Sequence, residues 1–383
     1  NYSYHHKYKY VTTPASAFFD RMASSGGLVK AGYWSSRSSL PVAAIESTLF
    51  THLYAGFAEV RPADGGVTFP KDYKVQFQKF TETVQRGSPN VKTLLSIGGE
   101  GPSPAKILSL VVGDQNKRAK FIQDSIALAR NYDFHGLDLC WLYPSSSDDD
   151  ADLDSFLNEW RAAIDEDHNN TRKDRLLLTA AVFHHPVIRR SNFNYPIQAI
   201  KDNLDWINVL AIDFYTPASN SSGETGPVHA WRTRSEDLQD RCGEKGIQNW
   251  INNRVATNQL LLALPFYGYE WILGQNSNNR GFFAPAHPGN KLPLSYKTIQ
   301  ETLARGNYTI PVTDGIYVAT YSHNDKRSWI GYDDERSISE KVKKAVKANL
   351  GGYFAWNVGF DDDNWTLSRA AKNACDPPAG ANQ

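Results

Sequence analysis

The sequence contains little cysteine and no excess of either charge. Only three of its 383 residues are cysteines, so a disulfide framework cannot hold the fold together and a large apolar core must do so. The 41 basic residues balance the 41 acidic ones, which argues against nucleic acid as the main partner. No run approaches the roughly 20 apolar residues of a membrane-spanning helix, so we expect no membrane span.

The sequence also has neither a starting methionine nor a hydrophobic leader, which favours a processed, mature chain. Five Asn-x-Ser/Thr glycosylation sequons occur, at Asn1, Asn169, Asn220, Asn307 and Asn364. Single sequons arise by chance, but this number favours a secreted glycoprotein.

Aromatic residues are abundant, with 10 Trp, 19 Tyr and 18 Phe. A well-filled core accounts for many of them. The alternative is a sugar-binding cleft, because aromatic faces stack on the apolar faces of pyranose rings.

Short apolar runs alternate with segments of helical periodicity along most of the chain. The runs are typical of strands buried on both faces of a parallel sheet. They cover Val29–Trp34, His52–Val60, Thr93–Ile97, Gly136–Leu142, Leu176–Phe183, Trp206–Phe214, Gln259–Pro265 and Gly352–Val358. Between them, apolar residues fall on one helical face over 73–84, 153–164 and 338–346.

Eight strands that alternate with helices predict an α/β fold of the (β/α)₈ TIM-barrel type. An open doubly wound sheet is the alternative, but no phosphate-binding glycine loop follows the first strand. We predict the barrel over 28–270 and 333–376, with a small α+β insertion over 271–332 after the seventh strand. An N-terminal extension over 1–27 and a tail over 377–383 complete the chain.

The cysteines and one acidic run have simple structural explanations. Cys140 lies within a predicted strand, as a small buried apolar residue. Cys242 and Cys375 would lie at opposite ends of the barrel, so we do not expect them to pair. The acidic run Ser145–Asp150 could bind a cation, but such runs more often cap the following helix, and we expect no metal.

The predicted fourth strand carries the most informative pattern. Alternate side chains of a strand share one face, so Asp138, Cys140 and Leu142 point the same way. A glycosidase strand would carry carboxyl groups at these positions. Here one carboxylate is followed by a thiol and then by a hydrocarbon, which cannot donate a proton.

Several motifs in this order resemble those of plant class V chitinases of glycoside hydrolase family 18, and the resemblance covers about 28–376. The segments that carry it are Ser96-Ile97-Gly98-Gly99, Gly136–Pro144, Leu210–Tyr215, Leu264–Trp271 and Gly352–Trp356. In these enzymes the fourth-strand motif is Asp-x-Asp-x-Glu. Its last acid protonates the glycosidic oxygen, and its middle Asp orients the substrate's acetamide, which acts as the nucleophile.

Three positions depart from that family pattern. Leu142 stands where the resemblance implies the catalytic acid, Cys140 where it implies the acetamide-orienting Asp, and Ile212 where it implies a Tyr that holds the acetamide. Asp138, deepest in the barrel, is expected to be structural. The resemblance therefore implies a degenerate, inactive homologue with no catalytic residue and no cofactor.

The resemblance also implies a retained sugar-binding cleft. Trp356 would form its floor, Tyr33 and Phe57 its walls, and Asp213, Tyr215 and Tyr267 would bind sugar hydroxyls. We therefore predict a non-catalytic, chitinase-like lectin that takes N-acetylglucosamine-containing glycans, as chitin oligosaccharides or on glycoproteins, with a role in plant defence.

Three alternatives remain open. The chain could bind and inhibit a microbial glycanase through surface loops, or serve as a seed storage protein. It could also be an enzyme whose acid has moved, and Glu100 and Glu270 are the spare carboxylates for that role. The dipeptide Glu270-Trp271 could in addition edge the cleft.

Overall fold

The computed structural model describes residues 27–144, 146, 148–218, 223–234, 241–275 and 277–376. Nearly all of the predicted extension, the whole C-terminal tail, and the sequons at Asn1 and Asn220 therefore lie outside the described residues. The other three sequon asparagines, Asn169, Asn307 and Asn364, are exposed.

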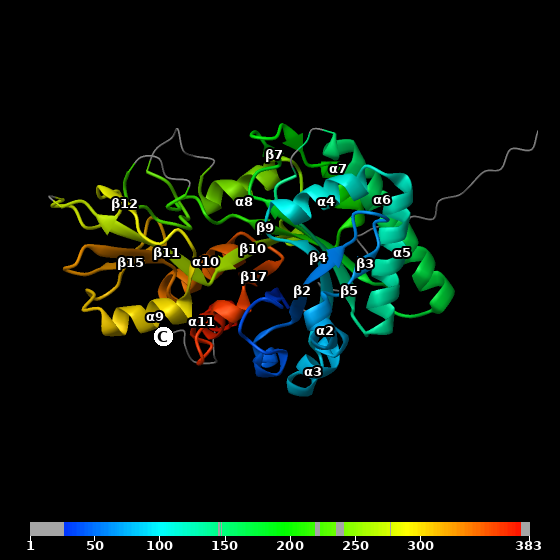
Figure 1. Cartoon of the computed structure of the whole chain (residues 1–383), viewed down its shortest axis with the longest axis horizontal. Helices are drawn as coiled ribbons and strands as arrows, with labels where there is room; N and C mark the ends of the chain where they lie inside the picture. Colours follow the sequence, from blue (N-terminus) through cyan, green and yellow to red (C-terminus); the bar gives the residue numbers. More distant parts are fainter. Residues whose placement is uncertain are drawn as a thin grey trace, which may run out of the picture.

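Eight parallel strands close into a barrel at the centre of the molecule (Figure 1). Their order around it is β1-β17-β10-β9-β6-β5-β4-β2, and β1 pairs with β2 to complete the ring. The strands are β1 (Val29–Ser35), β2 (His52–Val60), β4 (Lys92–Gly99), β5 (Gly136–Trp141), β6 (Leu177–Phe183), β9 (Trp206–Leu210), β10 (Leu260–Pro265) and β17 (Gly352–Trp356). The predicted (β/α)₈ TIM barrel is confirmed.

Two strands end earlier than the sequence predicts. The sixth, β9, ends at Leu210 rather than Phe214, because Asp213 adopts a left-handed backbone conformation with φ of 60°. Its backbone N–H then donates to Nδ1 of His229 instead of to a neighbouring strand. The eighth, β17, ends at Trp356 because Asn357 caps a 3₁₀ turn over Val358–Phe360. The early end of β9 places Ile212 and Asp213, which line the cleft described below, on a loop.

Helices cover the outside of the barrel. They are α2 (Lys74–Gln78), α3 (Phe80–Gly87), α4 (Pro102–Val112), α5 (Gln115–Asn131), α6 (Asp149–Thr171), α7 (Ile197–Asn203), α8 (Gly243–Asn252), α10 (Glu335–Lys347) and α11 (Thr366–Cys375). The periodicity over 153–164 and 338–346 is confirmed by α6 and α10. The helix predicted over 73–84 is instead interrupted at Lys79, which separates α2 from α3. None of the described helices is long and apolar enough to cross a membrane.

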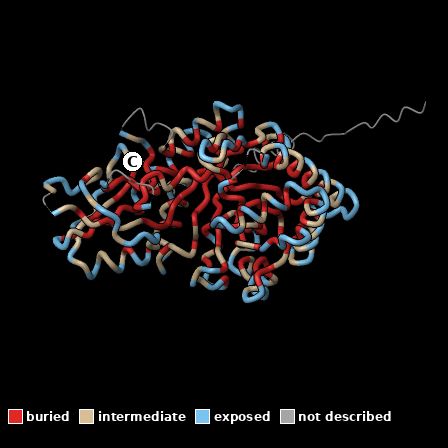
Figure 2. Tube along the Cα trace, turned by 45° about the horizontal axis from the view of Figure 1, so that its top comes forward, coloured by how far each residue is buried: buried red, intermediate tan, exposed pale blue. Residues whose placement is uncertain are grey.

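The buried residues form two layers, and Figure 2 shows the barrel strands buried along their length. The larger layer fills the space between strands and helices. The smaller one fills the barrel itself and includes Tyr33, Tyr54, Cys140, Phe354 and Trp356. Because the barrel interior is packed with side chains, a ligand can enter only at its ends.

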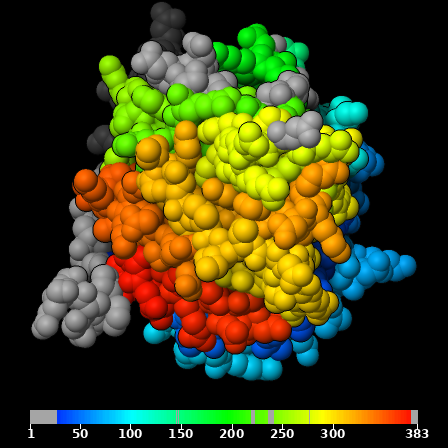
Figure 3. All heavy atoms as spheres, turned by 90° about the vertical axis from the view of Figure 1, so that its left-hand side faces the viewer, coloured from blue at the N-terminus to red at the C-terminus, as the bar shows by residue number. Residues whose placement is uncertain are grey.

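A second sheet lies beside the barrel, at the left of Figure 1, and Figure 3 turns it toward the viewer. Its strand order is β12-β11-β16-β15-β14, with β13 paired to β11. The elements are β11 (Tyr267–Leu273), β12 (Ala286–Pro288), β13 (Leu294–Ser295), α9 (Tyr296–Arg305), β14 (Val312–Asp314), β15 (Ala319–His323) and β16 (Ser328–Tyr332). Shorter two-residue strands elsewhere are β3 (Val67–Thr68), β7 (Val187–Ile188) and β8 (Phe193–Asn194).

This second sheet begins before the predicted boundary at Trp271, because Tyr267 already pairs with Ser295. Within the predicted insertion, the stretch 315–321 becomes a strand only from Ala319, where β15 begins. The first residues of this stretch form a turn in which Oδ1 of Asp314 accepts the backbone N–H groups of Ile316 and Tyr317. The division of the chain into a barrel and an insertion domain stays a prediction.

The cysteines lie where the sequence places them. Cys140 is buried in β5, Cys242 directly precedes α8, and Cys375 ends α11. Within the described part of the chain, which includes all three, no disulfide joins any two of them. In the acidic run, the Asp149 carboxylate accepts hydrogen bonds from Ser109 and Ser146 at the start of α6, and the described residues contain no cluster suited to a metal ion.

Candidate functional site

A cleft of about 720 Å³ opens at the C-terminal ends of the barrel strands, where this fold places its sites. The residues that line it come from strands and loops far apart in the sequence. They include Glu100 after β4, Leu142 and Tyr143 after β5, Phe183 in β6, Ile212 and Asp213 after β9, Tyr267 and Tyr269 in β11, and Trp356 in β17.

Asp138 lies below this cleft and is fully buried. Its Oδ2 accepts hydrogen bonds from Ser96 Oγ at 2.6 Å and Tyr33 Oη at 2.9 Å, and its Oδ1 accepts from Thr179 Oγ1 at 2.7 Å. Burial has the largest effect on the pKa of Asp138 and raises it to about 6, although the three hydrogen bonds act to lower it. The carboxyl joins four strands and offers no free oxygen to a ligand, as expected of a structural residue.

The two residues above Asp138 on the same face of β5 are apolar in character. Cys140 is fully buried, and burial, followed by the nearby Asp138, raises the pKa of its thiol. Leu142, directly after β5, is 8 % exposed and lines the cleft with Ile212, which is equally buried. This wall of the cleft can exclude water, but it can neither protonate a leaving oxygen nor hold an amide by hydrogen bonds.

Asp213 supplies the polar group on the opposite wall. Tyr267 Oη donates to Asp213 Oδ2 at 2.6 Å, while Oδ1 has no hydrogen-bond partner among the described residues. Burial raises the pKa of Asp213 to about 6; the Tyr267 hydrogen bond lowers it and the charge of Glu100 raises it. This Oδ1 is buried and lies 3.7 Å from His229 Nδ1, whereas the Asp213 side chain as a whole is 32 % exposed, so a ligand can contact the side chain but not this oxygen.

His229 holds this pair from behind. Its Nδ1 accepts the Asp213 backbone N–H at 3.1 Å, so its Nε2 carries the proton and donates to the Tyr267 carbonyl at 3.2 Å. Burial, and then the charge of Lys341, keep the pKa of His229 well below its ordinary value. The neutral ring thus fixes the backbone on both sides of the Asp213–Tyr267 contact.

Trp356 forms the floor of the cleft, at the end of β17, and its ring packs edge-on against Tyr33 at 4.8 Å between centroids. Glu100 rises beside it at the end of β4. Although solvent reaches Glu100, the surrounding cleft desolvates its carboxyl and raises its pKa, whereas Arg37 and Trp356 lower it. The floor therefore combines an aromatic face with a protonatable carboxyl at its edge.

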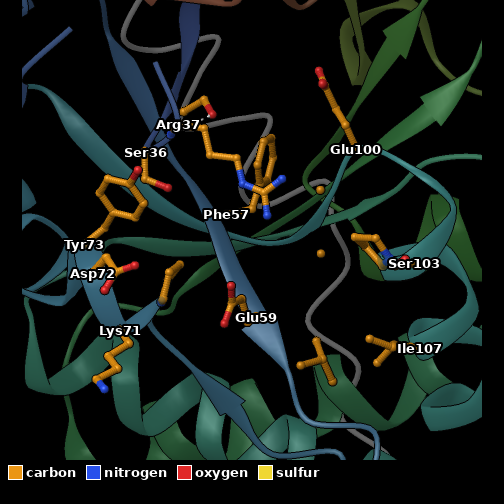
Figure 4. A pocket seen from close by; sticks show the side chains of 16 residues that line it. Ser36, Arg37, Phe57, Glu59, Lys71, Asp72, Tyr73, Glu100, Ser103 and Ile107 are labelled. Carbon is orange, nitrogen blue, oxygen red and sulfur yellow. Dashed lines mark hydrogen bonds between the residues drawn. The ribbon is translucent and has the colours of Figure 1, made fainter. Parts of the chain in front are cut away.

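Of the six predicted sugar-binding residues, the structure brings together Asp213, Tyr267 and Trp356 in this cleft. Phe57 lines an adjoining hollow of about 710 Å³ that shares Glu100 with the cleft (Figure 4). The two remaining placements need correction. Tyr33 is buried and its hydroxyl binds Asp138, and Tyr215 is buried against Phe283, so neither lines the cleft.

The prediction that Glu270 and Trp271 edge the cleft is also corrected. Glu270 points into the second sheet, where it accepts a hydrogen bond from Ser328 Oγ at 2.5 Å. Trp271 is buried there against Trp329.

Sequence reasoning missed several lining residues, which lie at strand ends, within β11 or on loops. They are Tyr143, Phe183, His184, Arg190, Arg241 and Tyr269. For Tyr143, Phe183 and His184, the rule that sites gather at the C-terminal ends of barrel strands would have found them. Arg190 and Arg241 lie on long loops, so no strand pattern points to them.

The family model described as glycosyl hydrolases family 18 matches residues 29–361. The chain belongs to this family. A class V chitinase of Arabidopsis thaliana is 39 % identical over 355 residues, which cover 91 % of this chain and 90 % of the relative. The match and the closed barrel together confirm the resemblance noted from the sequence motifs.

Two solved structures extend the comparison. A class V chitinase from Nicotiana tobaccum, a mutant in complex with NAG4, has a TM-score of 0.85 and 38 % identity, covering 91 % of this chain and 99 % of its own. A chitinase-like agglutinin from Robinia pseudoacacia has a TM-score of 0.82 and 40 % identity, covering 90 % and 99 %. A chitinase and an agglutinin resemble this family 18 chain to a similar degree. Overall similarity therefore does not distinguish a chitinase from an agglutinin, and the residues of the site must be compared instead.

Proposed function

We propose that this family 18 protein is a non-catalytic, chitinase-like lectin that binds N-acetylglucosamine-containing glycans or chitin oligosaccharides in the cleft. The observation that carries the proposal is Leu142, a hydrocarbon at the position where the family's motif implies the catalytic acid. General acid catalysis contributes about 10²–10⁴ in rate, and leucine can supply none of it.

The groups that would orient an acetamide nucleophile are absent as well. Cys140 is buried, with its pKa raised, and Ile212 has no hydrogen-bonding group. Without them a substrate loses positioning and electrostatic support in addition to the proton. Loss of all three groups disfavours even slow turnover by the family's mechanism.

The residues that remain fit sugar binding. The Trp356 face can stack on a pyranose ring, and the partly exposed Asp213 side chain lines the cleft beside the Tyr267 hydroxyl. Chitin oligomers occupy the related structures from Nicotiana tobaccum and Cycas revoluta, which supports an N-acetylated ligand.

Calorimetric titration with chitin oligosaccharides and with N-glycan cores tests binding, and release from a chromogenic chitotriose tests hydrolysis on the same preparation. We expect binding without release. Trp356→Ala should weaken binding by about tenfold or more, and by more than Phe57→Ala, because Trp356 supplies the stacking face. Silence toward every N-acetylated glycan would contradict the proposal.

One structural observation favours a second candidate, a relocated acid. Glu100 borders the cleft with a raised pKa, as a general acid requires. Glu100→Gln separates the two cases. Measurable chitotriose hydrolysis that this variant abolishes would establish Glu100 as the acid and overturn the non-catalytic assignment.

We also propose a secreted or vacuolar location, with glycan on some of the exposed sequons at Asn169, Asn307 and Asn364. Peptide mapping of the natural protein, with and without enzymatic deglycosylation, tests it. Unmodified asparagine at all three positions would count against this location.

A further inference from the structure

The two flanks of the cleft differ in charge. The hollow around Phe57 is lined by three carboxylates, Glu59, Asp72 and Glu100, against two cations, Arg37 and Lys71 (Figure 4). On the other side, a hollow of about 670 Å³ shares Asp213 and five other lining residues with the cleft. Among the described residues that line this hollow, the cationic and titratable basic ones are His184, His185, Arg189 and Arg190, and Asp213 is the one carboxylate. Arg241 adds a further cation to the adjoining wall of the cleft.

Two arginines on this basic flank are placed to act on a ligand. Arg190 is exposed and Arg241 is half-buried, and neither forms an ion pair with a carboxylate of the described chain. Arg241 Nη2 donates to the Phe214 carbonyl at 2.7 Å, and its guanidinium lies over the Tyr215 ring at 5.5 Å. These contacts hold the Arg241 side chain at the cleft wall, and no carboxylate among the described residues forms an ion pair with it.

The same flank carries aromatic faces and a further donor. Tyr143 is 56 % exposed and packs edge-on against Phe183, with 6.0 Å between ring centroids. His185 Nδ1 accepts the Val187 backbone N–H at 2.9 Å, so the proton of the neutral ring lies on Nε2. Aromatic faces next to guanidinium groups match a sugar ring that bears an anionic substituent.

We propose that the flank lined by Tyr143, Phe183, Arg190 and Arg241 binds an acidic sugar residue, one that carries a carboxylate or a sulfate. The proposal rests on the carbohydrate-binding function above and specifies its ligand: an oligosaccharide with a neutral N-acetylated residue over Trp356 and an acidic residue beside Arg190. A guanidinium binds carboxylate and sulfate through paired N–H donors, so both substituents fit the same geometry.

Calorimetric titration of the full chain with three forms of chitotetraose tests this. One form is unmodified, one is oxidised at its reducing end to carry a carboxylate, and one carries a 6-O-sulfate. We expect at least one acidic form to bind about tenfold more tightly than the neutral form at low salt, as for one new charge-assisted contact. The difference should shrink as salt increases, because the attraction is electrostatic.

Arg190→Gln should lower the ratio of acidic to neutral affinity by several-fold, and Arg190→Lys should retain part of it, because lysine keeps the charge without the paired donors. Arg254→Gln is the matched control. Arg254 is also exposed but lies between α8 and β10, at the opposite end of the barrel, so this variant should keep the full ratio.

Equal or weaker binding of both acidic forms would overturn this proposal and leave the lectin function standing. The proposal would also be overturned if Arg190→Gln and Arg254→Gln lowered the ratio of acidic to neutral affinity equally. The preference for acidic forms would then depend only on the net charge of the protein. Failure of all three probes to bind would overturn this proposal, and the same silence toward N-glycan cores would overturn the carbohydrate-binding function as well.

Discussion

Tyr267 donates a 2.6 Å hydrogen bond to Asp213, across the boundary between the barrel loops and the second sheet. Asp213 follows β9, whereas Tyr267 begins β11, and His229 binds the backbone of both residues. The contact therefore joins three distant segments of the chain at the wall of the cleft. It also influences the protonation of Asp213, a carboxyl that lines the cleft.

Tyr267→Phe should raise the pKa of Asp213 above its value of about 6, because the lost hydrogen bond lowers that pKa. We expect an increase of about one unit. Carbon NMR of the carboxyl resonance, assigned with Asp213→Asn, measures it directly. Tyr321→Phe is the control, because it removes a hydroxyl from the second sheet and should leave the pKa of Asp213 unchanged. An unchanged or lower pKa of Asp213 in Tyr267→Phe would show that the Tyr267 hydrogen bond does not govern that pKa.

Asp138 makes the stability of the barrel depend on pH. Its pKa is raised from 3.8 to about 6, so the folded protein binds this proton more tightly than the unfolded chain does. The contribution is fully present below about pH 4 and is lost as the pH rises through about 6, a total of about 3 kcal/mol.

Asp138→Asn should remove this part of the pH dependence. Urea unfolding at several pH values between about 4 and 7 should therefore show a smaller decrease in the free energy of unfolding for the variant than for the natural chain. Asp325→Asn, at an exposed position in the β15–β16 turn, provides the control. Parallel pH curves for the natural chain and Asp138→Asn would refute the assignment.

A buried ion pair supports the barrel from outside. Arg161 in α6 and Asp205 before β9 are each 6 % exposed and lie 2.8 Å apart, and Asp205 Oδ2 also accepts the Leu178 backbone N–H at 2.7 Å. Asp205→Asn leaves the guanidinium without a counterion, so it should cost about 3–5 kcal/mol of unfolding free energy.

The exposed pair of Arg232 and Glu244, which lie 2.9 Å apart, is the comparison for that experiment. Glu244→Gln should cost at most about 1 kcal/mol, because solvent already screens this pair. Denaturant midpoints at constant slope measure both variants, and similar losses for the two would show that burial does not strengthen the first pair.

The barrel could be predicted from the sequence because its strands are uniformly apolar and its helices strongly periodic. The errors fall where local geometry overrides that pattern. The apolar run Trp206–Phe214 looks like one strand, but the left-handed backbone at Asp213 and the bond to His229 end it at Leu210. The second sheet was placed too late because Tyr267, which follows β10 almost directly, already belongs to it.

The site was only partly predictable for a related reason. Motif positions on strands placed Trp356, Asp213 and Tyr267 in the cleft, since strand ends converge there. The same reasoning cannot tell whether a strand residue turns into the cleft or into the barrel, which is why Tyr33 was misplaced. Arg190 and Arg241 reach the cleft from loops, and only tertiary structure reveals them.

Leu142→Glu should not by itself create a chitinase. The new carboxyl would supply a proton donor at the end of β5, but Cys140 and Ile212 would still leave the acetamide unoriented. Release from a chromogenic chitotriose should therefore stay at background in Leu142→Glu. The triple variant Leu142→Glu, Cys140→Asp, Ile212→Tyr should exceed it by at least about tenfold, because proton donation and substrate positioning act together.

Leu142→Gln in the same triple background is the matched control, since it has a similar shape and no proton to give. Oligosaccharide binding is measured in each variant to show that the cleft is still formed. A variant that binds but does not hydrolyse chitotriose is then inactive for a reason other than misfolding. Rapid turnover by Leu142→Glu alone would mean that Cys140 and Ile212 do not limit catalysis, and that a single missing proton donor separates this family 18 protein from an active chitinase.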